Sequence, residues 1–198
     1  MKSSAKHARK TGRKELNEKL VRILRFLVLF NIFAIPLYIF IFLGISVYPL
    51  QMATAELVSC ILNSAGIPSS LSGIDITVAS EGMPFTGSIN WDCTGWKSML
   101  AFIALVFATD AGTKKKFRAL AFLPVLFIIN VLRVSFIFSY VHAYGLEYYQ
   151  EIHSFLFGFF MIAAALFLWV VWLKYFNFSE PNKRKSIKNK SRAHGLTA

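Results

Sequence analysis

Residues 119–140 read ALAFLPVLFIINVLRVSFIFSY, an apolar run in which the only strongly polar side chains are those of Asn130 and Arg133. About 20 consecutive apolar residues are enough to cross the hydrocarbon core of a bilayer, which is roughly 30 Å thick. We therefore expect this run to form a membrane-spanning helix. Its amide and guanidinium groups then lie inside the membrane, where polar and charged side chains are costly and mark functional sites.

Three more apolar runs extend the pattern over most of the chain. Residues 26–48 and 154–176 are long enough to span a bilayer, and residues 91–109 become so when counted from Trp91. The run at 26–48 is too long for the apolar region of a cleaved signal peptide. Hydrophobic residues make up 56% of the chain and the mean hydropathy is +0.53, which soluble domains rarely reach. The sequence predicts an all-α membrane protein with about four transmembrane helices.

The basic residues predict the orientation of these spans. Of 22 Lys and Arg residues, nine lie in residues 2–25, four in residues 114–118 and seven from Lys174 onward. Four spans place these clusters on one side of the membrane, which the positive-inside rule identifies as the cytoplasm. We expect a multi-pass membrane protein with both termini cytoplasmic. The net charge of +12 then attracts anionic lipids at the cytoplasmic face and does not indicate nucleic-acid binding.

The segment between the first two predicted spans is expected outside the membrane. Residues 50–65 have the amphipathic periodicity of an interfacial helix. Residues 66–92 are rich in turn-forming residues, and apolar and polar residues alternate from Ile74 to Val78, which predicts a small extracytoplasmic β-hairpin. The expected apolar face of the helix at residues 50–65 consists of Leu50, Ala53, Leu57, Ile61 and Leu62.

Cys93 lies in the sequence WDCTGW, residues 91–96, where the outer segment enters the second span. The free N–H groups at a helix N-terminus favour a thiolate over a thiol. Asp92 is expected to cap this helix. Cys93 has three open interpretations: an inert small core residue, a disulfide partner of Cys60, or a nucleophile.

Arg133 is predicted about 10 Å below the outer end of its span, since it lies seven residues from that end. A guanidinium at that depth is expected to face the helix bundle and find a partner. Asn130 lies three residues earlier and hence on the same helix face. The alternative is that the long Arg133 side chain reaches outward to the lipid headgroups.

His153 begins the last predicted span at the outer interface. A helix N-terminus disfavours the imidazolium, so the imidazole is expected to be neutral, as a general base requires. A histidine that merely faces the headgroups is the alternative. Taken together, Cys93, Arg133 and His153 come from three spans to one level near the outer mouth, with the groups that cysteine-based acyl transfer uses.

Other intramembrane chemistries find no support in the sequence. It contains no His-Glu-x-x-His motif, no Gly-x-Ser-x-Gly motif and no Cys-x-x-Cys motif. Of the four histidines, only His142 and His153 are predicted outside, which is too few for a metal site. We therefore expect neither a metal nor another cofactor.

Three ordered motifs resemble the exosortase/archaeosortase family. They are Asp92-Cys93-Thr94-Gly95, then Asn130-Val131-Leu132-Arg133, then His153 followed by Gly158. The family pattern is a Cys-[Ser/Thr]-Gly that opens a span, an Asn-x-x-Arg in the next span and a His at the head of another. The resemblance covers about residues 60–175. Many family members have about eight spans, whereas about four are predicted here.

The resemblance implies a membrane cysteine transpeptidase or protease. Its substrates would be membrane-anchored secreted proteins with a C-terminal sorting signal, made of a short motif, a hydrophobic span and a basic cluster. Cys93 would be the nucleophile, Arg133 the positive group and His153 the base, with the active site facing outside an archaeal or bacterial plasma membrane. The implied organisation is a basic cytoplasmic segment (1–25), a transmembrane catalytic domain (26–176) and a basic cytoplasmic tail (177–198).

Two other classes of function stay open from the residues alone. A non-catalytic membrane scaffold that binds a partner helix would not need Cys93. A thiol–disulfide protein would use both Cys60 and Cys93. Substitution of the two cysteines one at a time distinguishes these classes from a transpeptidase.

Overall fold

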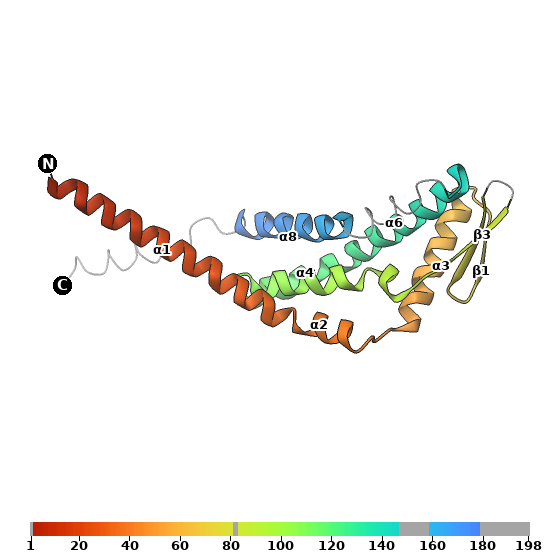
Figure 1. Cartoon of the computed structure of the whole chain (residues 1–198), viewed down its shortest axis with the longest axis horizontal. Helices are drawn as coiled ribbons and strands as arrows, with labels where there is room; N and C mark the ends of the chain where they lie inside the picture. Colours follow the sequence, from red (N-terminus) through yellow and green to blue (C-terminus); the bar gives the residue numbers. More distant parts are fainter. Residues whose placement is uncertain (1, 81–82, 147–158, 179–198) are drawn as a thin grey trace, which may run out of the picture.

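The computed structural model is mostly helical, with one small sheet at one end (Figure 1). It describes residues 2–80, 83–146 and 159–178, with side chains from residue 15 to residue 175 within those ranges. Two described helical stretches are long and apolar enough to cross a membrane, Glu15–Phe42 and Thr113–Tyr144. Two shorter apolar helices accompany them, Trp96–Ala108 and Met161–Tyr175. The four-span arrangement stays a prediction, and residues 154–158 of the last expected span lie outside the described residues.

The first apolar run is interrupted near its middle. Helix α1 covers Lys2–Phe33 and joins the basic N-terminal segment to the apolar run without a break. Helix α1 ends at Phe33, three residues before Pro36, and after Ala34 the helix α2 runs from Ile35 to Phe42. Proline lacks a backbone N–H and its ring crowds the preceding turn, which explains the break. The helix ends at Phe42, six residues earlier than the sequence suggests.

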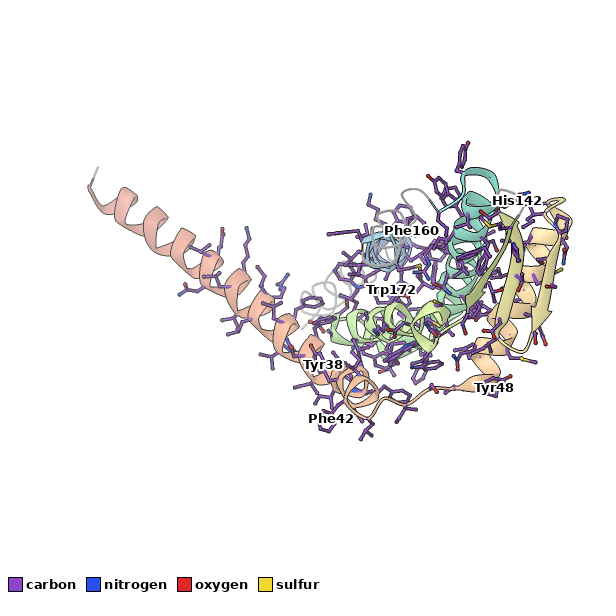
Figure 2. All side chains as sticks on the ribbon, turned by 45° about the vertical axis from the view of Figure 1, so that its right-hand side comes forward. Tyr38, Phe42, Tyr48, His142, Phe160 and Trp172 are labelled. Atoms are coloured by element: carbon purple, nitrogen blue, oxygen red, sulfur yellow. The ribbon has the colours of Figure 1, made fainter. Side chains whose placement is uncertain are left out.

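Apolar side chains on several helices face outward, as a membrane environment requires. Exposed fractions reach 62% at Leu24 and 89% at Phe42 on the first helices. Side chains of Tyr38 and Phe42 project away from the rest of the molecule (Figure 2). Exposed apolar surface on this scale marks a membrane or an interaction site. Helices α6 (Leu123–Tyr144) and α8 (Met161–Phe178) also carry such side chains, among them Ile128, Leu132, Phe136, Ile162 and Phe167.

Helix α3, Tyr48–Ser64, forms where the sequence predicts an amphipathic helix, but the buried face differs from the expected one. Leu57, expected on the apolar face, is 45% exposed. Buried polar side chains find partners instead: the Gln51 amide donates to the Ile89 carbonyl at 3.0 Å, and the Ser59 and Ser69 hydroxyls lie 2.8 Å apart. Hydrogen bonding therefore lets polar residues share the buried face. That face consists of Gln51, Thr54, Ala55, Val58, Ser59 and Leu62.

The outer segment folds into a three-stranded antiparallel sheet where the sequence suggests a hairpin. The strands are β1 (Ser69–Ser72), β2 (Asp75–Ser80) and β3 (Met83–Ser88), in the order β1-β2-β3. Ile76 and Val78 on β2 are buried, whereas Asp75, Thr77 and Ala79 on the other face are not. The alternation seen in the sequence thus marks the central strand, which packs its apolar face against α3 and α6.

A polar turn and the remaining helices follow the sheet. The short 3-10 helix η1 precedes α4, and α5 and η2 lead into α6, the longest apolar helix of the second half. In Figure 1, α4 lies beside the C-terminal part of α1, and α6 runs obliquely past α4 and α8 toward the sheet. The bounds are η1 Trp91–Thr94, α4 Trp96–Ala108, α5 Thr113–Ala119, η2 Leu120–Phe122, α6 Leu123–Tyr144 and α8 Met161–Phe178.

Two hydrophobic clusters form the described core, and α6 contributes to both. The first joins α3, β2 and α6, and the second joins α4, α6 and α8. Along α6, Leu126 belongs to the second cluster, whereas Val131 and Val134 belong to the first. Asn130 and Arg133 therefore lie where the two clusters meet. The remaining members of the first cluster are Ala55, Val58, Leu62, Ile76, Val78, Ile89 and Phe138, and those of the second are Phe102, Val106, Ala119, Ala165, Leu168 and Trp172.

Candidate active site

Cys93 lies on η1, the turn that links the sheet to α4. Its backbone N–H donates to the Asn90 carbonyl at 2.9 Å, and the Thr94 hydroxyl donates to the Trp91 carbonyl at 2.8 Å. Gly95 then adopts a left-handed conformation, with φ of 75°, and α4 begins at Trp96. The side chain of Cys93 is half-buried. The thiol is thus held on a tight turn just before a helix, and not on the helix itself.

Asn130 of α6 fastens this turn to the bundle. Its amide nitrogen donates to the Cys93 carbonyl at 2.7 Å, and its side chain is fully buried. A Cβ atom at Gly95 would lie 2.8 Å from Asn130 Cγ and 3.1 Å from its Oδ1. Glycine is therefore required at position 95 twice over, for its positive φ and for the close approach of Asn130. The Cys-Thr-Gly motif and the Asn-x-x-Arg motif are therefore in direct contact through Asn130.

We expect Gly95→Ala to destabilise the protein more than a glycine substitution elsewhere does. A non-glycine residue in the left-handed region costs about 1–3 kcal/mol, and here the Asn130 contact adds to that cost. The apparent melting temperature of the protein in detergent measures the effect. Gly66→Ala is the matched control, because Gly66 has a φ of 79° and no atom within 4 Å of the added Cβ. An equal shift in both variants would contradict a tight Gly95–Asn130 contact.

Arg133 brings a buried positive charge to the same turn. It lies three residues after Asn130 on α6, hence on the same helix face, and is only 4% exposed. Its guanidinium interacts electrostatically with the Cys93 thiol. The side chain is thus buried among the helices, as the position of Arg133 within the apolar run suggests. Burial of the thiol disfavours the thiolate, and the positive charge of Arg133 opposes that cost.

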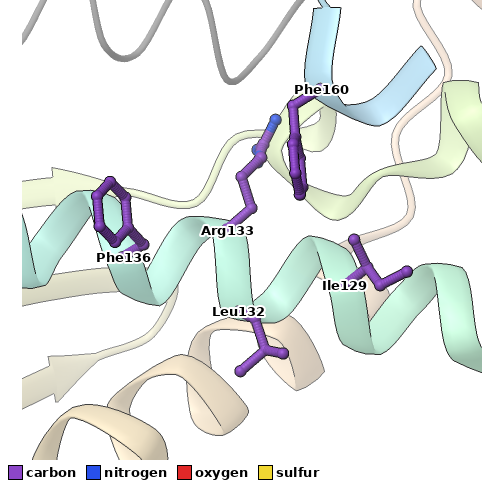
Figure 3. Close-up of a pocket in the computed structure, with 5 residues that line it drawn as sticks. All are labelled: Ile129, Leu132, Arg133, Phe136 and Phe160. Atoms are coloured by element: carbon purple, nitrogen blue, oxygen red, sulfur yellow. The ribbon is translucent and has the colours of Figure 1, made fainter. Parts of the chain in front are cut away.

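A pocket of about 370 Å³ opens beside Arg133 on the α6 surface (Figure 3). Phe160, just before α8, stands next to the Arg133 side chain in this view. Leu132 and Phe136 line the pocket and are each more than half exposed, at 53% and 54%. Ile129 completes the lining. The pocket is therefore an apolar recess with one guanidinium in its wall.

The sequence pattern of the transmembrane exosortase family (Exosortase_EpsH) matches residues 16–171. This match covers more than half of the chain. The protein belongs to the transmembrane exosortase family. Exosortases are membrane transpeptidases or proteases that act on proteins bearing sorting signals. None of the curated proteins and none of the solved structures compared with the chain matches it.

The side chain of Asp92, next to Cys93 in the chain, does not have the expected role. Asp92 does not cap a helix; its carboxylate pairs with Lys97 at 2.9 Å, and both side chains are nearly half exposed. Gly95 takes the N-cap position of α4 because η1 separates Cys93 and Asp92 from that helix. Cys60 is exposed on α3 and, like Cys93, is a free thiol.

His153, the expected third member of the exosortase site, lies outside the described residues. The other histidine that the sequence places outside is His142, near the end of α6, and its Nδ1 lies 2.6 Å from the Ala79 carbonyl of the sheet. Among the described side chains, no group of three or more His, Cys, Asp or Glu residues could hold a metal ion. The described part of the site is therefore a thiol, a guanidinium and the amide that fixes their spacing.

Two residues of the candidate site could not be identified from the sequence alone. Gly95 is part of a recognisable motif, but its contact with Asn130 depends on how α4 and α6 cross. Phe160 has no sequence signal beyond being one more aromatic in an apolar run. The spacing of Asn130 and Arg133 is the signal that could be read, since two polar residues on one face of an apolar helix need a common polar neighbour.

Proposed function

We propose that this exosortase is a cysteine transpeptidase or protease that cuts secreted, membrane-anchored proteins near a C-terminal sorting signal. Cys93 is the nucleophile, Arg133 the positive group and His153 the general base. The observation that carries the proposal is that Asn130 hydrogen-bonds to the Cys93 carbonyl while Arg133, buried on the same face of α6, brings its charge to the same turn. A buried guanidinium is costly in a membrane protein and is retained where it has a function.

The proposed reaction proceeds through a thioester. The Cys93 thiol gives its proton to a nitrogen of the neutral His153 imidazole, and the sulfur attacks the carbonyl carbon of the substrate peptide bond. When the tetrahedral intermediate collapses, the C–N bond breaks and the imidazolium returns the proton to the departing amine. An amine acceptor or a water molecule then attacks the thioester and releases the Cys93 thiol. The amine gives transfer to the acceptor and water gives hydrolysis.

Arg133 has two opportunities to lower the barrier in this scheme. Before attack, its charge favours the Cys93 thiolate. During attack, it faces the negative charge that develops on the carbonyl oxygen, and a fixed charge in a dry site is effective because nothing needs to reorganise. Asn130 acts as a positioning residue, since its hydrogen bond to the Cys93 carbonyl holds the turn at the height of Arg133.

The pocket beside Arg133 supports entry of the substrate from within the membrane. Its lining is apolar apart from Arg133, and Leu132 and Phe136 lie on an exposed face of α6 (Figure 3). A hydrophobic substrate span can pack against such a face, which places the peptide just outside that span beside Cys93. We propose an active site that faces outside, with both termini and their basic segments in the cytoplasm.

A co-expression experiment tests this function. The substrate is a secreted reporter that ends in a short motif, a hydrophobic span and a basic cluster, with one tag before the motif and another at the C-terminus. We expect the two tags to separate only in cells that also contain the exosortase. Intact reporter in the presence of correctly inserted exosortase would favour the membrane-scaffold alternative.

His153→Asn is expected to slow reporter cleavage by about 10²-fold, within the usual range for loss of a general base. His142→Asn is the matched control, because it removes the other histidine predicted outside, whose ring hydrogen-bonds to the Ala79 carbonyl of the sheet. Raising the pH of the external medium should restore part of the rate in the His153 variant, since hydroxide replaces the missing base. Equal cleavage by both histidine variants would remove His153 from the mechanism.

A further inference from the structure

The free edge of strand β3 lies at the end of the sheet that leads to Cys93. Because the strand order is β1-β2-β3, one side of β3 pairs with β2 and the other has no partner strand in the described chain. Beyond Ser88 the chain continues through two residues into η1, so Cys93 comes five residues after the strand ends. Figures 1 and 2 both show β3 running on into this turn.

The hydrogen-bond pattern identifies which backbone groups of β3 point away from β2. The Ile89 N–H donates to the Ile74 carbonyl at 2.9 Å, so these two residues form a hydrogen-bonded pair at the end of the ladder. Such pairs alternate along antiparallel strands with pairs that exchange no bonds. Counting back from Ile89, residues 87, 85 and 83 bond to β2. Pro84, Thr86 and Ser88 therefore direct their backbone groups outward.

Thr86 is the centre of this free edge. Its N–H and C=O both point outward, whereas Pro84 offers only a carbonyl and the Ser88 carbonyl already accepts from the Asn90 N–H at 3.0 Å. All three residues are exposed. The Thr86 and Thr77 hydroxyls lie 2.8 Å apart, as expected for the closer side chains of a pair without backbone bonds. An extended chain placed along β3 can accept a hydrogen bond from the Thr86 N–H and donate one to the Thr86 C=O.

The two edges of the sheet differ in how far they are closed. On β1, the Ser69 N–H donates to Asn63 Oδ1 of α3 at 2.9 Å, which blocks a further strand there. On β3, no described side chain bonds to an outward backbone group. Proteins commonly protect an open edge with charged residues or proline. Strand β3 has the sequence MPFTGS, which has no charge, and its one proline, Pro84, lies near the end of the strand away from Cys93. The β3 edge is thus the one that can accept another strand.

We propose that the substrate segment just before its hydrophobic span binds as a fourth strand on β3, centred on Thr86. This inference rests on the proposed cysteine transpeptidase or protease function. We infer that the added strand is the substrate because β3 leads directly to η1. A chain that lies along β3 therefore reaches Cys93 in an extended form. Main-chain hydrogen bonds supply the binding and alternate side chains supply the selectivity, as in other cases of strand addition.

Thr86→Pro tests the edge in the reporter assay. Proline removes the outward N–H and blocks the pairing position, but breaks no backbone hydrogen bond to β2. We expect cleavage at least about 10-fold slower than in Thr86→Ala, which loses the same hydroxyl and keeps the N–H. Leu71→Pro on β1 is the control for proline in this sheet, since its N–H also points away from β2 but on the closed edge. Equal rates in the two Thr86 variants would overturn the proposal.

A crosslinking experiment gives a second readout that does not depend on cleavage. In a Cys60→Ser, Cys93→Ala background, Thr86→Cys is combined with reporters that carry single cysteines at successive positions before the hydrophobic span. Oxidation in membranes should give disulfides that alternate in yield with a period of two residues, as a paired strand requires. Uniform or absent crosslinking at Thr86→Cys overturns strand addition. If instead Cys93→Ala alone still cleaves the reporter, the proposed function fails while the crosslinking result stands by itself.

Discussion

Cys93→Ala is expected to abolish processing of a sorting-signal reporter, with a fall in rate of about 10³-fold or more, because loss of a covalent nucleophile removes the intermediate that divides the reaction into two steps. Cys93→Ser should be nearly as inactive, since a hydroxyl is a much weaker nucleophile than a thiolate at neutral pH. The measurement is the rate at which the two tags of the reporter separate, with the amount of exosortase in the membrane matched between variants.

Cys60→Ser is the control that separates the alternatives for Cys93. Cys60 is the other free thiol of the chain and is exposed on α3, so its removal costs little packing. A transpeptidase or protease tolerates Cys60→Ser, whereas a thiol–disulfide protein loses activity with either cysteine. A non-catalytic scaffold is indifferent to both. Native processing by Cys93→Ala would therefore exclude the proposed nucleophile outright.

The burial of Arg133 was predictable because physics leaves few choices for a charge inside an apolar run. A guanidinium roughly 10 Å deep in a span must face other helices or extend to the surface. The presence of Asn130 on the same face favours the first option. The sequence therefore predicts a polar junction on α6 but not what fills it, because the partner turn around Cys93 comes from 37 residues earlier in the chain.

The buried face of α3 was predicted wrongly, and the reason is instructive. A count of apolar residues selects the face with Leu57, but that side chain is 45% exposed. Burial of Gln51 and Ser59 depends on the Ile89 carbonyl and the Ser69 hydroxyl, which only the folded sheet provides. Hydrophobic periodicity assigns faces reliably when water is the outer solvent. Beside a membrane, the apolar face of a helix can point to lipid while hydrogen-bonded polar groups point inward.

The third strand of the sheet escaped prediction for a similar reason. Alternation of apolar and polar residues identifies a strand with one buried face, which describes β2. Strand β3 has the sequence MPFTGS, in which Pro84 and Gly87 argue against a strand by composition. Both are tolerated here. At position 84 the backbone N–H would point away from β2, so the absence of this donor in Pro84 breaks no bond to β2. Gly87 leaves room for the Phe138 ring, which would lie 2.8 Å from an added Cβ.

Arg133→Gln is expected to slow reporter cleavage by about 10³-fold, the upper end of the loss seen when one donor to a developing oxyanion is removed. We expect a large effect because the guanidinium is buried beside the Cys93 turn and, in the proposed mechanism, faces the charge that develops on the carbonyl oxygen. Arg133→Lys should recover part of the rate, because it keeps a positive charge but not the planar fork of donors. The reporter assay measures both variants.

Lys97→Gln is the matched control, since Lys97 is the other cation close to the Cys93 turn and its ion pair with Asp92 is exposed. Exposed ion pairs contribute only about 0–1 kcal/mol, so this variant should cleave within a few-fold of the native rate. Labelling of Cys93 by a maleimide in a Cys60→Ser background adds a readout that a purely structural role would not move. If Arg133 stabilises the thiolate, Arg133→Gln shifts the pH profile of labelling to higher pH, whereas Lys97→Gln leaves the profile unchanged. Identical profiles in the two variants would mean that Arg133 holds the bundle together and does not act on the sulfur.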